Sequence, residues 1–233
     1  MAEGEERDDL RGKIERYSQG SYIEELHEAA AVLTGMVPVL GGPLGAYITG
    51  AANERKAKRL KELFLALADD LDGIKGKLSS DYLKTDDFAD LFEETVRRVA
   101  SERDEEKRRI YKNILVGVIG YQDVDAYDEQ LRVLKTLDDL QPDHIAVLKA
   151  ITVRPTEGQL LRLSGVSGFK MNTLEERLQD IPQRSIEDLV SDLNRMGLTD
   201  LRNLQLMMSA SGAQDLSSSL TPYGERFLTF VKG

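Results

Sequence analysis

The stretch AAAVLTGMVPVLGGPLGAYITGAAN, residues 29–53, contains no charged residue, although Asp, Glu, Lys and Arg make up 31% of the chain. An uncharged stretch of this length is buried either in protein or in lipid. Prolines and glycines interrupt its centre at Pro38, Gly41, Gly42, Pro43 and Gly45. Because these residues break a helix, the stretch predicts two helical arms joined by a tight bend, a hydrophobic hairpin.

Apolar residues at helical spacing continue on both sides of the hairpin. The first arm is expected over residues 21–34 and the second over residues 44–77. In the second arm a seam of apolar residues recurs at steps of four, three, four and three, namely Leu60, Phe64, Leu67, Leu71 and Ile74. Such a seam packs against another helix, either within the chain or in a second protomer.

Further helices are expected before residue 140. Thr85 is the predicted N-cap of the first of these helices. Ser101, with Asp104 three residues later, marks the start of a second helix, which is expected to end at Gly120. A third helix is expected over residues 125–140. No strand-like alternation is present in this half. We therefore predict a mainly α protein with an acidic lead over 1–20, whose order the sequence leaves open, and a helical bundle over 21–140.

Charge and cysteine content exclude several function classes. The net charge is −10, and residues 1–140 account for −9 of it, with 21 basic against 30 acidic residues. Neither half has the basic surplus of a nucleic-acid binder. The absence of cysteine excludes disulfides, thiolate nucleophiles and Cys-based zinc sites. The acidic lead lacks the basic and apolar regions of a signal peptide, so we expect a cytoplasmic protein.

The sequence offers no recognisable catalytic constellation. The two histidines, His27 and His144, lack zinc-site spacing, and we expect His27 on a helix surface and His144 half-exposed. Ser167 and Lys170 match S-x-x-K without its companion motifs, and the hairpin glycines lack the Lys of a P-loop. We therefore expect no enzyme activity, no small-molecule substrate, and no catalytic, cofactor-binding or metal-binding residue.

The pattern changes at Pro142, which suits the first turn of a helix. Helices are expected over 144–151, 172–179 and 185–196, with Gly197 in a left-handed conformation after the last. Residues 204–208 and 217–220 predict two short strands. Residues from about 142 to 232 resemble a winged-helix domain. The resemblance lies in the order of three segments: SIEDLVSDLNRMGLTD, a polar hairpin, and LTPYGERFLTFV. The predicted C-terminal domain, residues 141–233, is thus a small α+β module.

This resemblance implies a recognition helix over 185–196 and a wing tip over 209–219. The helix carries Glu187, Asp188 and Asp192 against Arg195, and the wing tip has Asp215 and no Lys or Arg. Winged helices that read DNA place cations on these surfaces. The residues present favour protein docking. The alternative that stays open is a DNA-binding transcription regulator whose helical half dimerises or senses a ligand.

The N-terminal half resembles a group of uncharacterised bacterial helical-bundle proteins. Two sequence motifs carry this resemblance. The first is VPVLGGPLGAY, which is the Gly/Pro-bent hydrophobic hairpin, and the second is EEKRRIYKNIL. The resemblance implies a bacterial origin and an association with antiviral defence.

Three interpretations of the hairpin stay open: burial in the protein core, conditional engagement of a membrane or partner, and a membrane span. Gly41 and Gly45 have the spacing that lets helices pack closely. The hairpin residues concerned are Val37, Pro38, Leu40, Gly41, Gly42, Pro43, Leu44, Gly45 and Ile48. The basic flank that follows comprises Arg55, Lys56, Lys58, Arg59 and Lys61, which suits anionic lipid.

We therefore predict a non-enzymatic interaction protein. Its hairpin would engage a protein partner or an anionic membrane, at the inner face of that membrane, and its winged-helix region would dock or restrain the hairpin. The seam also predicts a homo-oligomer.

Overall fold

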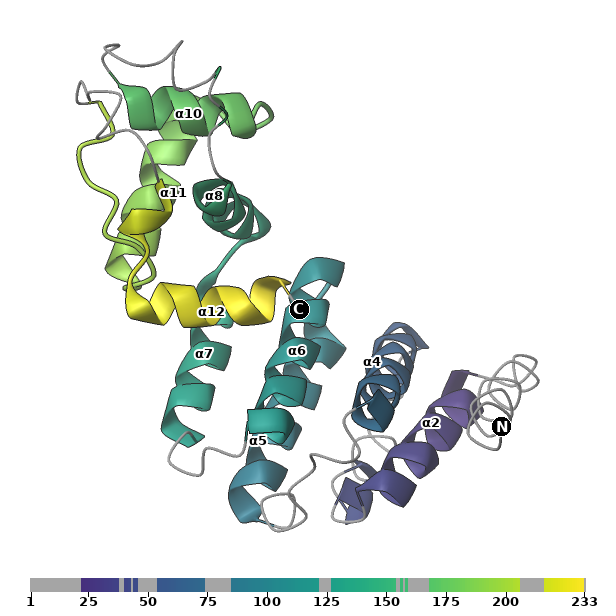
Figure 1. Ribbon diagram of the computed structural model, residues 1–233. Helices are drawn as coiled ribbons and strands as arrows, with labels where there is room; N and C mark the ends of the chain where they lie inside the picture. The colour runs from purple at the N-terminus through teal and green to yellow at the C-terminus, as the bar shows by residue number, and fades with distance from the viewer. Residues whose placement is uncertain are drawn as a thin grey trace. The chain divides into compact units, whose positions relative to one another are not determined.

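The computed structural model describes residues 22–37, 40–42, 44–45, 54–73, 85–121, 127–153, 156, 158, 168–205 and 216–232. Within these residues the protein is mainly helical and contains no strand. The chain divides into two compact units, residues 1–131 and 132–233, which are described separately below (Figure 1).

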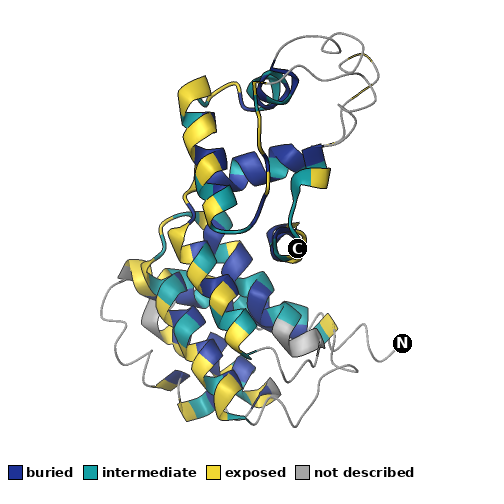
Figure 2. Ribbon diagram, turned by 90° about the vertical axis from the view of Figure 1, so that its left-hand side faces the viewer, coloured by how far each residue is buried: buried dark blue, intermediate teal, exposed yellow. Residues whose placement is uncertain are grey.

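The N-terminal unit is a helical bundle. Its helices are α2 (Tyr22–Met36), α4 (Glu54–Gly73), α5 (Asp86–Ser101), α6 (Glu105–Tyr121) and the first residues of α7 (Tyr127–Asp139). Helix α2 packs on α4, and α4 packs on both α5 and α6, which also contact each other. Each helix buries one face and exposes another (Figure 2), the amphipathic pattern from which the bundle was predicted.

Helix α5 begins and packs as the sequence predicts. The Thr85 side chain accepts a hydrogen bond from the backbone N–H of Phe88 at 3.3 Å, and two aspartates occupy the first turn. Its expected apolar stripe is entirely buried: Phe88, Leu91, Phe92, Val96 and Val99.

The break between α5 and α6 corrects one detail of the prediction. Asp104 is the capping residue, because its Oδ1 accepts from the backbone N–H of Lys107 at 2.8 Å. Ser101 does not cap α6, since its hydroxyl donates back to the carbonyls of Arg97 and Arg98 at 3.1 and 3.0 Å. A hydroxyl that is bonded to the preceding turn is not available to cap the next helix. Helix α6 also continues through Gly120, which was expected to close it.

Both ends of the expected second arm of the hairpin lie outside the described residues. The described helix, α4, covers residues 54–73 of the predicted 44–77. Residues 46–53 and 74–84 belong to the part that is not described, so the positions of Ile48 and Ile74 stay predictions.

The C-terminal unit is assembled around α8 (Pro142–Thr152). This helix contacts α10 (Phe169–Arg177), α11 (Gln183–Arg195), the 3-10 helix η5 (Leu216–Ser219) and α12 (Pro222–Lys232). Pro142 occupies the first turn of α8, and Gly197 has a φ of 74° after α11; both were predicted. The rest of α7 meets α12 through Tyr223, whose hydroxyl lies 2.7 Å from Thr136 Oγ1.

The expected strand over 217–220 is wrong. These residues form η5 followed by a single antiparallel bridge between Leu220 and Thr199. The physical reason lies in Asn194, whose side-chain oxygen accepts from Leu201 N at 2.9 Å and from Thr199 Oγ1 at 2.7 Å. A backbone bonded to a side chain does not extend a ladder. Leu204 and Gln205 form a turn, and residues 206–215, including Asp215, lie outside the described residues.

The segment LTPYG, residues 220–224, packs α12 against the backbone after α11 through two close contacts. Thr221 Oγ1 accepts from Gly224 N at 2.9 Å, which caps α12, and donates to the carbonyl of Gly197 at 2.5 Å. A Cβ at Gly224 would lie 1.9 Å from the carbonyl oxygen of Leu198. Glycine at this position therefore lets α12 approach the backbone that follows α11.

Candidate functional site: the hairpin and the groove on its second arm

The apolar residues of the hairpin bend that the structure describes are buried. Val37, Leu40 and Leu44 have exposed fractions of 1%, 0% and 1%. Gly41 is half-buried, and a Cβ there would lie 3.1 Å from the Thr34 methyl group, whereas Gly42 and Gly45 are exposed. Pro38, Pro43 and Ile48 are not among the described residues. The side chains of Val37, Leu40 and Leu44 therefore face protein.

The described helices carry no candidate membrane span: none combines sufficient length with sufficient apolar character.

The seam packs inside the N-terminal unit. Its four described members, Leu60, Phe64, Leu67 and Leu71, are at most 1% exposed. Phe64 stacks on Phe92 of α5 with ring centroids 6.4 Å apart. In this conformation these side chains leave no surface for a second protomer, so the seam acts as an intrachain contact.

The basic flank divides into two groups. Arg55, Lys56 and Lys58 are exposed. By contrast, Arg59 Nη1 donates to the carbonyl of Ala100 at 3.1 Å, and Lys61 pairs with a carboxylate of α2. The first group therefore lies on the surface of α4, where Lys58 Nζ is 4.0 Å from Glu62 Oε1.

The two arms of the hairpin are joined by an ion pair. Lys61 Nζ of α4 lies 2.5 Å from Glu25 Oε2 of α2. The Glu25 side chain is 11% exposed and that of Lys61 is 27% exposed. A pair that is largely shielded from water is screened less than a surface pair, and the loss of one partner leaves the other charge poorly solvated. We call this pair the hairpin latch.

A groove of about 680 Å³ lies on the other side of the second arm, between α4 and α6. Its apolar lining consists of Leu63, Ala66 and Val99. Its charged lining consists of Arg59 and Glu62 from α4 and of Glu105, Glu106, Arg108, Arg109 and Lys112 from α6. The groove-lining residues recur on each helix at three- and four-residue steps, so each helix turns one continuous face towards it.

Ion pairs tie the rim of this groove together. Arg108 lies 3.8 Å from Glu62, Arg109 lies 3.4 Å from Glu106, and Lys112 pairs with Asp70. Arg108 Nη1 also donates to the carbonyl of Arg103 at 2.8 Å. The rim is therefore ordered, with acidic side chains at the start of α6 and basic ones a turn or two later.

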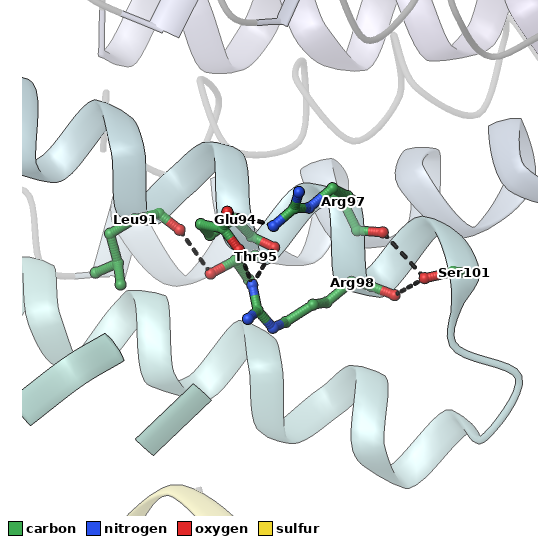
Figure 3. Close-up of polar contacts among 6 residues, drawn as sticks. All are labelled: Leu91, Glu94, Thr95, Arg97, Arg98 and Ser101. Carbon is green, nitrogen blue, oxygen red and sulfur yellow. Dashed lines mark hydrogen bonds and ion pairs between the residues drawn. The ribbon is translucent and has the colours of Figure 1, made fainter. Parts of the chain in front are cut away.

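The end of α5 that borders this region is fixed by a local network (Figure 3). Glu94 accepts from both Arg97 and Arg98, and Arg98 Nη1 also donates to the Glu94 carbonyl at 3.1 Å. Partial burial raises the pKa of Glu94, but the hydrogen bonds from Arg98 and Arg97 outweigh it and hold that pKa below its ordinary value. The carboxylate is thus kept ionised.

The placement of His144 corrects an expectation. It was predicted to be half-exposed, but it is 4% exposed, because its Nδ1 accepts from the backbone N–H of Gln141 at 3.0 Å and holds the ring against α8. Its Nε2 lies 3.5 Å from Asp192 Oδ2. Hydrogen bonding to Arg195 is the main cause that lowers the pKa of Asp192. This cluster joins α8 to α11 and stabilises the unit.

The remaining candidate residues do not assemble into a site. His27 is exposed, as expected, and Ser167 is not among the described residues. Lys170 Nζ donates to the carbonyl of Arg202 at 3.0 Å. Across the part of the chain that the structure describes, no group of three His, Cys, Asp or Glu side chains is placed to hold a metal ion.

The face of α11 that points to solvent is mixed in charge. The helix buries Ile186, Leu189, Val190 and Leu193 and exposes Arg184, Glu187, Asp188 and Arg195. Arg195 donates to Asp192 at 2.8 Å, and Glu187 accepts from Gln205 at 2.9 Å. Cations on this face are therefore partly neutralised by their neighbours.

Sequence reasoning missed the latch and the groove. Both depend on which helix lies beside which, and no spacing within one helix reveals that. Comparison with known proteins does not supply it either: no family model, no curated protein and no solved structure matches this chain.

Proposed function

We propose that the chain is a non-enzymatic interaction protein whose hairpin engages an anionic membrane when the hairpin latch opens. The observations that carry this proposal are the burial of Val37, Leu40 and Leu44 at the bend and the ion pair that joins its two arms. An apolar, uncharged bend is kept from water in the closed form, and opening exposes it.

The charge that follows the hairpin supports a membrane as the target. Arg55, Lys56 and Lys58 are exposed within about one turn of each other at the start of α4. Cations near an anionic surface each contribute about 1 kcal/mol of attraction. An apolar bend next to a basic turn combines the two forces by which proteins bind to the membrane interface.

Flotation with anionic liposomes tests this proposal. Three proteins are compared: wild type, Lys61→Glu, which places two carboxylates at the latch, and the swap Glu25→Lys with Lys61→Glu, which restores an ion pair. We expect Lys61→Glu to float strongly and the swap to return to the wild-type level. Equal flotation of both variants would show that the latch does not control binding. The absence of flotation for all three would favour an ordinary core hairpin and a protein partner.

The C-terminal unit is proposed to be the docking or restraining module. The exposed carboxylates of Glu187 and Asp188 on α11 support a protein contact over a DNA contact, since phosphate repels them. The order of α8, α10 and α11 supports the winged-helix interpretation, whose wing stays a prediction.

The alternative, a DNA-binding regulator, is supported only by the exposed Arg184 and Arg195 on α11. Its test is the shift of random duplex DNA at low salt. A salt-dependent shift would favour this alternative, and its absence would count against it, because non-specific binding relies on phosphate neutralisation.

A further inference from the structure

The bend of the hairpin packs on the last turn of α2. Val37 N donates to the carbonyl of Leu33 at 2.7 Å, and Leu40 N donates to the carbonyl of Val37 at 3.1 Å. These bonds carry the chain on from α2, and the next residue, Gly41, lies beside the side chain of Thr34. A Cβ added at Gly41 would be 3.1 Å from Thr34 Cγ2 and 4.0 Å from Thr34 Oγ1. We call this packing of Gly41 on the Thr34 methyl group the bend contact.

The Thr34 side chain is held in one orientation. Its hydroxyl donates to the carbonyl of Ala30 at 2.8 Å, one turn earlier in α2. Because threonine is branched at Cβ, fixing the hydroxyl also fixes the methyl group. The methyl group can therefore turn away from Gly41 only if the hydrogen bond to Ala30 is broken.

Gly41 differs from the other described glycines near the bend. A Cβ added at Gly35, Gly42 or Gly45 would have nothing within 4 Å. Gly41 and Gly42 both have helical backbone, a conformation that alanine adopts readily. At Gly41, however, the Thr34 methyl group lies closer than the 3.4 Å at which ordinary van der Waals contact begins. Alanine at position 41 would therefore push the bend away from α2, whereas alanine at position 42 would not.

The bend contact and the hairpin latch lie at opposite ends of α2. Glu25 of the latch is in the first turn, and Thr34 is in the last turn. The latch joins the first turn to α4, whereas the bend contact joins the bend to the last turn. Leu40, which is fully buried, directly precedes Gly41, so the bend contact is the nearer of the two to the apolar side chains of the bend.

We propose that Thr34 is a positioning residue, whose methyl group holds the bend closed through its contact with Gly41. Separation of this contact lets the bend move away from α2 and uncovers Leu40 and Leu44, which are buried in the closed form. The latch then restrains α2, and the bend contact restrains the bend itself. The use of this opening for membrane entry rests on the proposed function; the role of Thr34 in closing the bend does not.

Thiol labelling tests the bend contact in the full chain, which has no cysteine of its own. Leu40→Cys places one thiol in the bend, and its rate of modification by a maleimide under native conditions reports how often the bend opens. Gly41→Ala and Gly42→Ala are compared in this background, because they make the same change in neighbouring helical residues. Thr34→Ser is then combined with Gly41→Ala, since it removes the methyl group and keeps the hydroxyl.

Two further thiols separate opening of the bend from unfolding of the bundle. Leu44→Cys, on the other side of Gly41, repeats the measurement, so the result does not depend on how well one buried position tolerates cysteine. Val96→Cys, in the buried stripe of α5, reports unfolding of the bundle as a whole.

We expect Gly41→Ala to speed labelling at both bend thiols about tenfold over Gly42→Ala. Thr34→Ser should return the rate of the Gly41→Ala protein to that of the Gly42→Ala protein, and the Val96→Cys thiol should react slowly throughout. Three results would each overturn the proposal: equal rates for the two alanine variants, no slowing by Thr34→Ser, or equal acceleration of the Val96→Cys thiol.

Flotation with anionic liposomes, measured on the same variants without added cysteine, separates this proposal from the proposed function. If Gly41→Ala opens the bend without raising flotation, the role of Thr34 holds and the membrane function fails. If labelling shows no opening, the role of Thr34 fails whatever the flotation result.

Discussion

Lys61 and Glu25 form a 2.5 Å ion pair across the hairpin, from the second arm to the first. The pair joins α4 to the first turn of α2, at the end of α2 that is remote from the buried Val37, and it uses a lysine that the sequence assigns to a lipid-facing basic flank. One charge of that flank is therefore paired with α2, whereas Arg55, Lys56 and Lys58 are exposed.

The latch should contribute measurably to stability. Lys61→Glu should lower the free energy of unfolding by about 1–3 kcal/mol, because a shielded carboxylate loses its partner and gains a like charge. Urea denaturation measures the change. The swap Glu25→Lys with Lys61→Glu should recover at least half of the loss, and failure to recover any would show that packing of these stems, not charge, is responsible.

Gly224→Ala should destabilise the C-terminal unit severely. The new Cβ would lie 1.9 Å from the Leu198 carbonyl oxygen, so α12 must move away from the backbone after α11. We expect a loss of about 3 kcal/mol or more by thermal unfolding. Gly73→Ala is the matched control, since nothing lies within 4 Å of its added Cβ, and it should change stability by less than about 0.5 kcal/mol. Similar losses for both would contradict the close approach.

Asn194→Ala should also weaken the C-terminal unit. Its side chain donates to the Leu201 carbonyl at 3.0 Å and accepts from Leu201 N and Thr199 Oγ1, so the substitution leaves buried backbone groups unsatisfied. A loss of about 2–3 kcal/mol is expected in chemical denaturation. Ser191→Ala, an exposed change on the same helix, serves as the reference and should be nearly neutral.

The Glu94 network should give the bundle a pH dependence. The pKa of Glu94 is lowered in the folded protein, so its ionised form adds stability above the ordinary pKa of 4.5, and this contribution is lost as the pH falls through the lower, folded-state value. Glu94→Gln should therefore be less stable than wild type at pH 7, and the gap should close below about pH 4.5. A gap that stays constant down to pH 3 would contradict an electrostatic origin.

Periodicity predicted the helices because each of them buries a single stripe. The residues Phe88, Leu91, Phe92, Val96 and Val99 show this for α5, where the cap at Thr85 also follows from local sequence. The spacing of four and three in the seam of α4 likewise identifies its buried face. The spacing could not show whether this face packs against a helix of the same chain or of a second protomer, because either arrangement requires the same apolar stripe.

Side-chain contacts between distant residues escaped prediction. The strand expected at Ser217–Leu220 does not form beyond a single bridge to Thr199. Asn194, about two dozen residues earlier, accepts the hydrogen bond from Leu201 N in the segment that faces Ser217–Leu220. His144 was misplaced because its acceptor role at Gln141 draws the ring inward. The latch and the groove need the neighbours of α4 to be known. Within any one helix, the charged residues of the latch and the groove have the pattern of an ordinary solvent-exposed helix face.

The most direct test of the central claim is dye release from anionic vesicles by a latch-opened protein, Lys61→Glu, with and without Leu44→Glu at the bend. The account predicts that Lys61→Glu causes release and that the added glutamate abolishes it, while circular dichroism shows the same helix content in both proteins. Equal release by the two proteins would contradict the claim, because a charge at the buried bend would then have no effect on membrane entry.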